Sequence, residues 1–104
     1  MIGRRPKFDD VIRRQLDAFE RDHADVIDEA EAKLAAYNAG ERDEAEELYG
    51  DYIDALETGT EILADVRDAY AQSLDERFAD RYLRDFDRAV AKRLPPFRLE
   101  LENR

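Results

Sequence analysis

The sequence YNAGERDEAE at residues 37–46 contains the turn on which the predicted fold depends. Asn38 and Gly40 favour the end of a helix, and Gly40 is expected to adopt the left-handed conformation just after it. Asp43 and Glu46 have the spacing of an N-cap and its capping-box partner, so a second helix should begin there. Because the connection is short, the two helices should lie side by side and antiparallel.

The segment before this turn has the apolar spacing of one long helix over about residues 6–38. Pro6 suits the first helical position, and neither proline nor glycine follows it before Gly40. The apolar residues recur in alternating steps of four and three, as in a coiled-coil seam, with His23 filling one position. This first seam consists of Ile12, Leu16, Phe19, Val26, Ala30 and Tyr37.

The segment after the turn predicts a second long helix over about residues 43–72. Its seam consists of Ala45, Tyr49, Tyr52, Leu56, Leu63, Val66 and Tyr70. Gly59 occupies one seam position without a side chain, although glycine costs a helix about 1 kcal/mol. If the helices pair around Gly40, Gly59 should face Phe19 and His23 and leave room for these bulky side chains.

The spacing changes after Tyr70, where apolar residues follow one another at intervals of four. They are Leu74, Phe78, Tyr82, Phe86, Val90 and Leu94. A strict four-residue stripe rotates around a helix by about 40° per step, so it cannot stay on one straight seam. The change therefore predicts a break near Ser73, which with Glu76 has capping-box spacing, and a shorter third helix over about residues 75–94.

The last ten residues follow two prolines, Pro95 and Pro96, which should terminate the third helix. Apolar and polar residues alternate from Phe97 to Leu101. For residues 95–104 this pattern leaves two alternatives, an extended tail that lies on the surface or disorder.

Together these patterns predict an all-α, coiled-coil-like helical bundle, with residues 1–104 as a single helical domain. Charged residues make up 42% of the chain, against about 25% in an average globular protein, so most of them should lie on exposed helix faces. No apolar run approaches the roughly 20 residues of a membrane span. The segment Met1–Pro6 lacks the apolar core of a signal peptide, so we expect the protein in the cytoplasm.

The net charge of −10 bears on the partners that the protein can bind. Nucleic acids and anionic membrane surfaces attract positive charge, so we expect no nucleic acid and no membrane as partner. Basic proteins and cations stay open as partners. The absence of cysteine excludes disulfides and cysteine–zinc sites.

The predicted geometry leaves one half of the hairpin without cover. A third helix of about 20 residues extends over only half of the long hairpin, so the apolar half around the turn should be exposed. Exposed apolar stripes mark interfaces, so we predict a homodimer that forms a four-helix bundle, or a helical protein partner. A monomer results if the third helix and tail fold further over the hairpin. The predicted interface residues are Ile27, Leu34, Tyr37, Leu48, Tyr49 and Ile53.

Candidate chemistry is limited to one histidine and to repeated carboxylates. His23 alone cannot form a zinc site. Carboxylates four residues apart, as in Glu47 with Asp51 and Glu61 with Asp65, can chelate divalent cations, but the Glu-x-x-His motif of diiron bundles is absent. We interpret these carboxylates as a solvated helix face and predict no catalytic residue, no metal site and no cofactor.

The segments DEAEEL at 43–48 and EILADV at 61–66 resemble motifs of the MazG-type all-α nucleotide pyrophosphohydrolases. That family carries Glu-Glu-x-x-Glu and Glu-x-x-Asp on different helices that converge on Mg²⁺. Here Asp43 replaces the first Glu, Ile62 replaces a Glu of the second motif, and both segments fall on one predicted helix. The leading hypothesis is therefore a non-enzymatic interaction or self-associating structural module. The resemblance implies the alternative, a metal-dependent hydrolase that uses carboxylates of the second helix.

Overall fold

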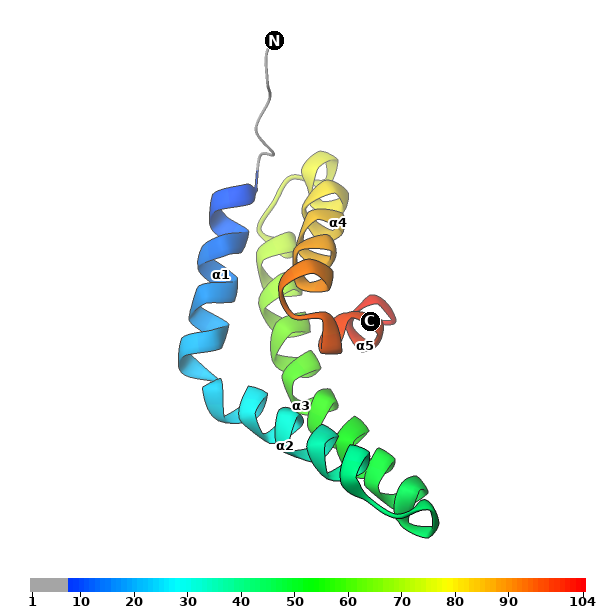
Figure 1. Cartoon of the computed structure of the whole chain (residues 1–104). Helices are drawn as coiled ribbons and strands as arrows, with labels where there is room; N and C mark the ends of the chain where they lie inside the picture. The colour runs from blue at the N-terminus through cyan, green and yellow to red at the C-terminus, as the bar shows by residue number, and fades with distance from the viewer. Residues whose placement is uncertain (1–7) are drawn as a thin grey trace.

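A computed structural model describes residues 8–104, which form helices joined by short turns (Figure 1). The elements are α1 (Asp9–Asp22), α2 (Ala24–Ala39), a 3₁₀ turn (Arg42–Glu44), α3 (Ala45–Gln72), α4 (Glu76–Arg93), a second 3₁₀ turn (Pro95–Phe97) and α5 (Arg98–Glu102). No strand occurs among these residues, so the predicted all-α bundle is confirmed. The molecule is elongated and measures 55 × 24 × 24 Å. The predicted helix start at Pro6 lies outside the described residues.

The turn between α2 and α3 lies where it was predicted but uses different caps. The predicted box of Asp43 and Glu46 is replaced by one in which the Glu41 N–H donates to the Glu44 side chain at 3.2 Å and the Glu41 side chain accepts from the Glu44 N–H. This reciprocal pair forms because the chain enters α3 through a 3₁₀ turn.

Gly40 is extended, with φ −79° and ψ 166°, and is not left-handed as predicted. A Cβ at this position would collide with the Leu48 side chain and lie 3.2 Å from the Ala36 carbonyl oxygen. The glycine is therefore explained by the close packing of Leu48 over the turn.

The first long helix is not continuous, which corrects the prediction of one helix over residues 6–38. His23 has φ −127° and ψ 36°, outside the helical region, and separates α1 from α2. The α2 helix packs closely along α3, whereas α1 turns away from α3 and packs against α4 (Figure 1).

Aromatic side chains occupy the space that this bend opens. Phe8 meets Tyr82 edge-on at a centroid distance of 5.4 Å, and Phe19 meets Phe97 edge-on at 6.0 Å. All four side chains are buried. These contacts pack the α1 segment against α4 and the C-terminal turn on the side of the bend where α1 leaves α3.

A break separates α3 from α4 near Ser73, as the change of apolar spacing after Tyr70 predicted. The cap differs from the prediction, because Asp75 and not Ser73 accepts a hydrogen bond from the Arg77 N–H, at 2.9 Å. The Ser73 hydroxyl instead donates to the Tyr70 carbonyl at 2.6 Å. The four-residue stripe of α4 faces the core, and its central members Tyr82, Phe86 and Val90 are fully buried.

The C-terminal segment is helical, which corrects the prediction of an extended tail over residues 95–104. Phe97 and Leu101 are buried, whereas Leu99 is 63% exposed. Phe97 and Leu101 are four residues apart and share one face of a helical turn, so the alternating apolar pattern fits a helix as well as an extended chain. The buried Arg67 side chain holds this segment through a hydrogen bond to the Leu101 carbonyl at 3.3 Å.

Gly59 contacts the C-terminal turn, and not Phe19 and His23 as predicted. A Cβ on Gly59 would lie 3.0 Å from Phe97 Cζ and closer still to Cε1. The Phe97 ring belongs to the segment predicted to be a tail. Matching residues across the two helices of the hairpin therefore could not identify Phe97 as the neighbour of Gly59. The glycine lets this ring approach the α3 backbone.

We predict that Gly59→Ala lowers the free energy of unfolding by about 1–3 kcal/mol, because the buried Phe97 ring cannot move away from the new methyl group. Gly50→Ala is the matched control, since a Cβ there meets nothing within 4 Å, and its better helix propensity should add about 1 kcal/mol. Urea unfolding followed by circular dichroism measures both. A gain for both variants would show that Phe97 does not rest on Gly59.

Tyr82 makes the fold sensitive to alkaline pH. Burial raises the pKa of Tyr82 to about 12, although its hydroxyl donates to Gln15 Oε1 at 2.9 Å. In the unfolded chain a tyrosine ionises near pH 10. The unfolded chain therefore loses this proton first, and the stability that Tyr82 contributes below pH 10 is lost as the pH rises toward 12.

We predict that Tyr82→Phe makes the fall in melting temperature above pH 10 shallower. At neutral pH the same variant should lose about 1 kcal/mol with its hydrogen bond. Tyr49→Phe, at an exposed tyrosine, should leave the alkaline fall unchanged. Thermal unfolding across the alkaline range measures all three proteins, and equal slopes would contradict this role of Tyr82.

Candidate functional site

One end of the molecule, about a third of the chain, is a hairpin of two helices. We call residues 24–56 the tip hairpin; it contains α2, the first 3₁₀ turn and the first part of α3. In Figure 1 its far end extends beyond α4 and α5, and neither helix covers it. The predicted interface residues all lie here. Five of them are half-buried, and Tyr49 is 49% exposed.

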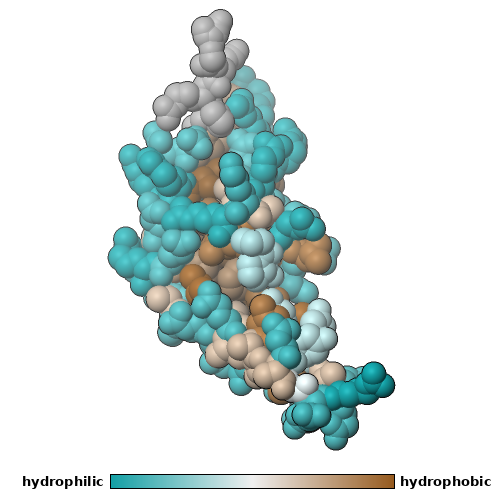
Figure 2. All heavy atoms as spheres, in the orientation of Figure 1, coloured by the Kyte–Doolittle hydropathy of each residue, from teal (hydrophilic) through white to brown (hydrophobic). Residues whose placement is uncertain are grey.

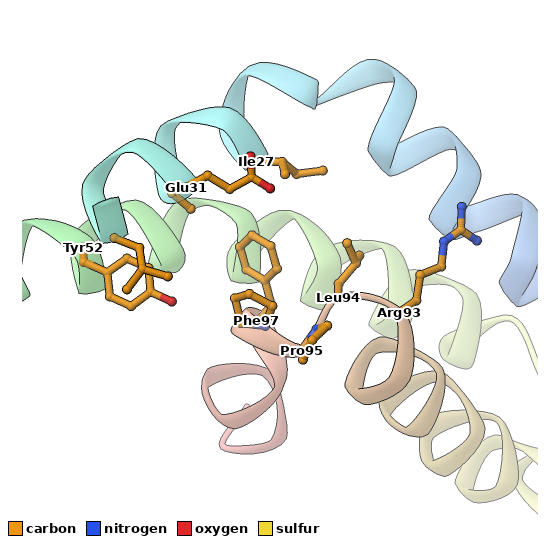
Figure 3. Close-up of a pocket in the computed structure, with 10 residues that line it drawn as sticks. Ile27, Glu31, Tyr52, Arg93, Leu94, Pro95 and Phe97 are labelled. Atoms are coloured by element: carbon orange, nitrogen blue, oxygen red, sulfur yellow. The ribbon is translucent and has the colours of Figure 1, made fainter. Parts of the chain in front are cut away.

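A groove opens where α4 ends and the tip hairpin begins. It encloses about 230 Å³ between α2, α3 and the turn after α4. Its lining residues are Ile27, Ala30, Glu31, Leu34, Tyr52, Arg93, Leu94, Pro95, Pro96 and Phe97. Figure 3 shows that the labelled side chains come from these three segments. Most of the lining is apolar, so the groove offers little to a strongly polar ligand.

The sequence builds one wall of the groove from the end of α4. Pro95 lacks an N–H group and starts a 3₁₀ turn, so the chain leaves the helix direction after Leu94. Leu94 and Phe97 are buried and anchor this turn on both sides, whereas Pro95 and Pro96 are exposed. The wall is therefore fixed by packing at its base and is accessible at its rim.

The structure brings the predicted interface residues together in two groups. Ile27 and Leu34 line the groove. The rings of Tyr37 and Tyr49 contact each other at a tilt of 60°, with centroids 5.3 Å apart. The Tyr49 ring lies 6.2 Å from that of Tyr52, which connects this aromatic row to the groove.

Two predicted interface residues have other contacts. Leu48 packs over Gly40, and Ile53 packs against the core. Sequence reasoning missed Tyr52 as a groove residue and missed the whole wall from Leu94 to Phe97. The signal for the wall was the aromatic residue that follows the two prolines.

The two charged residues of the groove differ in their pairing. The Arg93 guanidinium points toward α1 (Figure 3), where it contacts Asp17 at 2.5 Å and Glu20 at 2.7 Å. The hydrogen bonds that Arg93 donates to Glu20 and then to Asp17 raise the pKa of Arg93 above its usual value. Glu31 has no ion pair within residues 8–104. The free charge at the edge of the groove is therefore negative.

The tip hairpin also carries most of the net charge of the chain. Residues 24–56 contain eleven Asp and Glu and two Lys and Arg, a net charge of −9, so the other 71 residues together have a net charge of −1. In Figure 2 hydrophobic side chains appear between hydrophilic rims, and the far end of the tip is hydrophilic. The groove is therefore an apolar site with strongly acidic surroundings.

The carboxylates do not converge on a metal site within residues 8–104, where no three His, Cys, Asp or Glu side chains lie close enough to hold a cation. Glu47, Asp51, Glu61 and Asp65 are exposed along the single helix α3. His23 is half-buried and its ring lies 5.6 Å from that of Phe19. Its surroundings are those of a packing residue at the helix bend.

The helices within residues 8–104 include none that is long and apolar enough to span a bilayer. Comparison with protein-family models, curated proteins and solved structures found no match to this chain. The functional argument therefore rests on the groove and its surroundings.

We predict that salt stabilises the protein, because the clustered carboxylates of the tip hairpin repel one another. Raising NaCl from about 0.01 M to about 1 M shortens the screening length from about 30 Å to about 3 Å. A gain of about 1 kcal/mol would raise the melting temperature by about 4–8 °C. Glu31→Gln, which removes an unpaired charge in the middle of α2, should reduce this salt dependence. A melting temperature that falls with salt would contradict the prediction.

Proposed function

We propose that this protein is a non-enzymatic protein–protein interaction module that binds its partner through the groove and the adjoining face of the tip hairpin. One observation carries the proposal: the third helix of the bundle stops at Arg93, and an apolar groove follows directly beyond it. Exposed apolar surfaces of this kind mark sites of association. A partner would complete the three-helix packing that α4 provides elsewhere.

The size of the groove favours a protein partner over a small molecule. Its volume of about 230 Å³ is below the roughly 300–1,000 Å³ of typical small-molecule pockets. It includes Tyr52, which connects it to the aromatic row of Tyr49 and Tyr37. Tyrosines of this kind are frequent in the buried centres of protein interfaces.

The distribution of charge favours a different protein over a second copy of this chain. A two-fold contact through the tip would place two surfaces of net charge −9 against each other. Like charges brought together in an interface cost free energy, and physiological salt screens them only beyond about 8 Å. A homodimer through the tip is therefore the less favoured form of the proposal.

The proposal predicts that Leu34→Glu abolishes capture of the partner by the immobilised protein from a lysate of the cells that express it. The charge would enter the groove wall and remove its apolar contact. Leu99→Glu is the control, because it places the same charge at a leucine that is 63% exposed and does not line the groove. It should retain the partner. Circular dichroism must show that both variants are folded.

Light scattering on the purified chain completes this test. We expect a monomer of 12.1 kDa. Twice this mass, reduced to the monomer mass by Leu34→Glu, would identify a second copy as the occupant of the groove. Identical captured proteins for the wild type and both variants, together with a monomer mass, would contradict the proposed function.

A further inference from the structure

We infer that the occupant of the groove is an amphipathic α-helix of another protein, with lysine or arginine on both sides of its apolar stripe. This inference rests on the proposed function and specifies the partner by its chemistry. It combines three features of the described residues: the helical geometry of the vacant position, the apolar floor of the groove, and the sign of the charge around it.

The vacant position has the geometry of a helix site. Ile27 and Leu34 are seven residues apart, so they lie on one face of α2, about 10 Å apart along its axis. A helix that docks on two other helices inserts side chains at positions i, i+3 or i+4, and i+7, which repeat over the same distance. In the other part of the bundle, α4 is the third helix that packs against α1 and α3. Its apolar stripe of Tyr82, Phe86 and Val90 is fully buried.

The floor of the groove accepts a large apolar side chain. Ile27, Leu34, Leu94 and Phe97 line it, and Tyr52 lies on its side toward the tip (Figure 3). A leucine or an aromatic residue of the partner would bury its surface there, worth about 25 cal/mol for each Å² removed from water. The apolar stripe of the partner helix would then continue along Tyr52 and Tyr49.

The charges around the groove select the flanks of that helix. Glu31 lies at the groove edge without an ion pair among residues 8–104, while Arg93 is held by Asp17 and Glu20. The surrounding hairpin adds its net charge of −9. Basic flanks would be attracted during approach and could pair with Glu31, whereas acidic flanks would be repelled.

Residues 8–104 of a second copy do not supply such a helix. The most basic helix among the described residues is α4, with six Arg and Lys and four Asp and Glu. Its apolar stripe is already buried in the core of its own molecule. A second copy would therefore offer either an acidic hairpin or a basic helix without an apolar face.

The test uses three synthetic peptides of about 18 residues, or about 27 Å as a helix. The first has leucines at coiled-coil spacing with lysines on both flanks, the second has glutamates in place of the lysines, and the third is a scramble of the first without a stripe. Fluorescence anisotropy measures the affinity, and backbone amide shifts of the full-length protein locate the binding site.

We expect the lysine peptide to bind and to shift the amides of Ile27, Leu34, Tyr52 and Phe97, with an affinity at least tenfold higher than that of the glutamate peptide or the scramble. Glu31→Gln should weaken it about two- to fivefold, the effect of one exposed charge pair. Glu31→Lys should reduce the difference between the lysine and glutamate peptides. The affinity of the lysine peptide should fall as salt is added.

Other results separate the inference from the proposed function. Equal binding of the glutamate peptide at the groove would overturn the inference and leave the groove as a protein-binding site. Equal binding of the scramble would show attraction by charge alone and would also overturn it. If no peptide binds, the inference is wrong. If Leu34→Glu also captures the same proteins from the lysate as the wild type, the proposed function is wrong as well.

Discussion

The contact of the Phe97 ring with the backbone of Gly59 determines how the two halves of this molecule differ. Any side chain at position 59 would occupy the space of the ring. With the ring in place, the chain after α4 closes down on α3, and Phe97 also meets Phe19 edge-on. The same ring therefore packs against both α1 and α3, close to the break at His23 beyond which α2 packs along α3.

The C-terminal helix depends on a second, polar attachment to the same face of α3. The Arg67 side chain is 5% exposed and hydrogen-bonds to Asp87 at 3.0 Å as well as to the Leu101 carbonyl. Burial raises the pKa of Asp87 even though Arg67 opposes this shift. A buried ion pair contributes little net stability but fixes orientation, since leaving either charge unpaired is costly. Arg67 thus aligns α4 and α5 and, through them, the wall of the groove.

Local signals in the sequence predicted the helices and their breaks, because caps, prolines and apolar periods act over a few residues. The turn at Gly40 and the change of period after Tyr70 are of this kind. The bend at His23 has no proline or glycine to mark it, and the contact beside it joins Phe19 to Phe97, a residue far along the chain. The groove could be predicted only in part. The apolar stripe of the hairpin indicated Ile27 and Leu34, whereas the other wall comes from residues 94–97, a segment whose spacing also fits an extended chain.

The two parts of the molecule also differ in their distribution of charge. Ion pairs such as Arg93 with Asp17 and Glu20 join helices in the half that contains the core, whereas the tip hairpin concentrates net charge of one sign. Such repulsion lowers the stability of the free hairpin and opposes contact between copies. The same field would speed the approach of a basic partner and be neutralised on binding. Binding of a basic partner would therefore bury the apolar groove and relieve the repulsion within the tip hairpin at the same time.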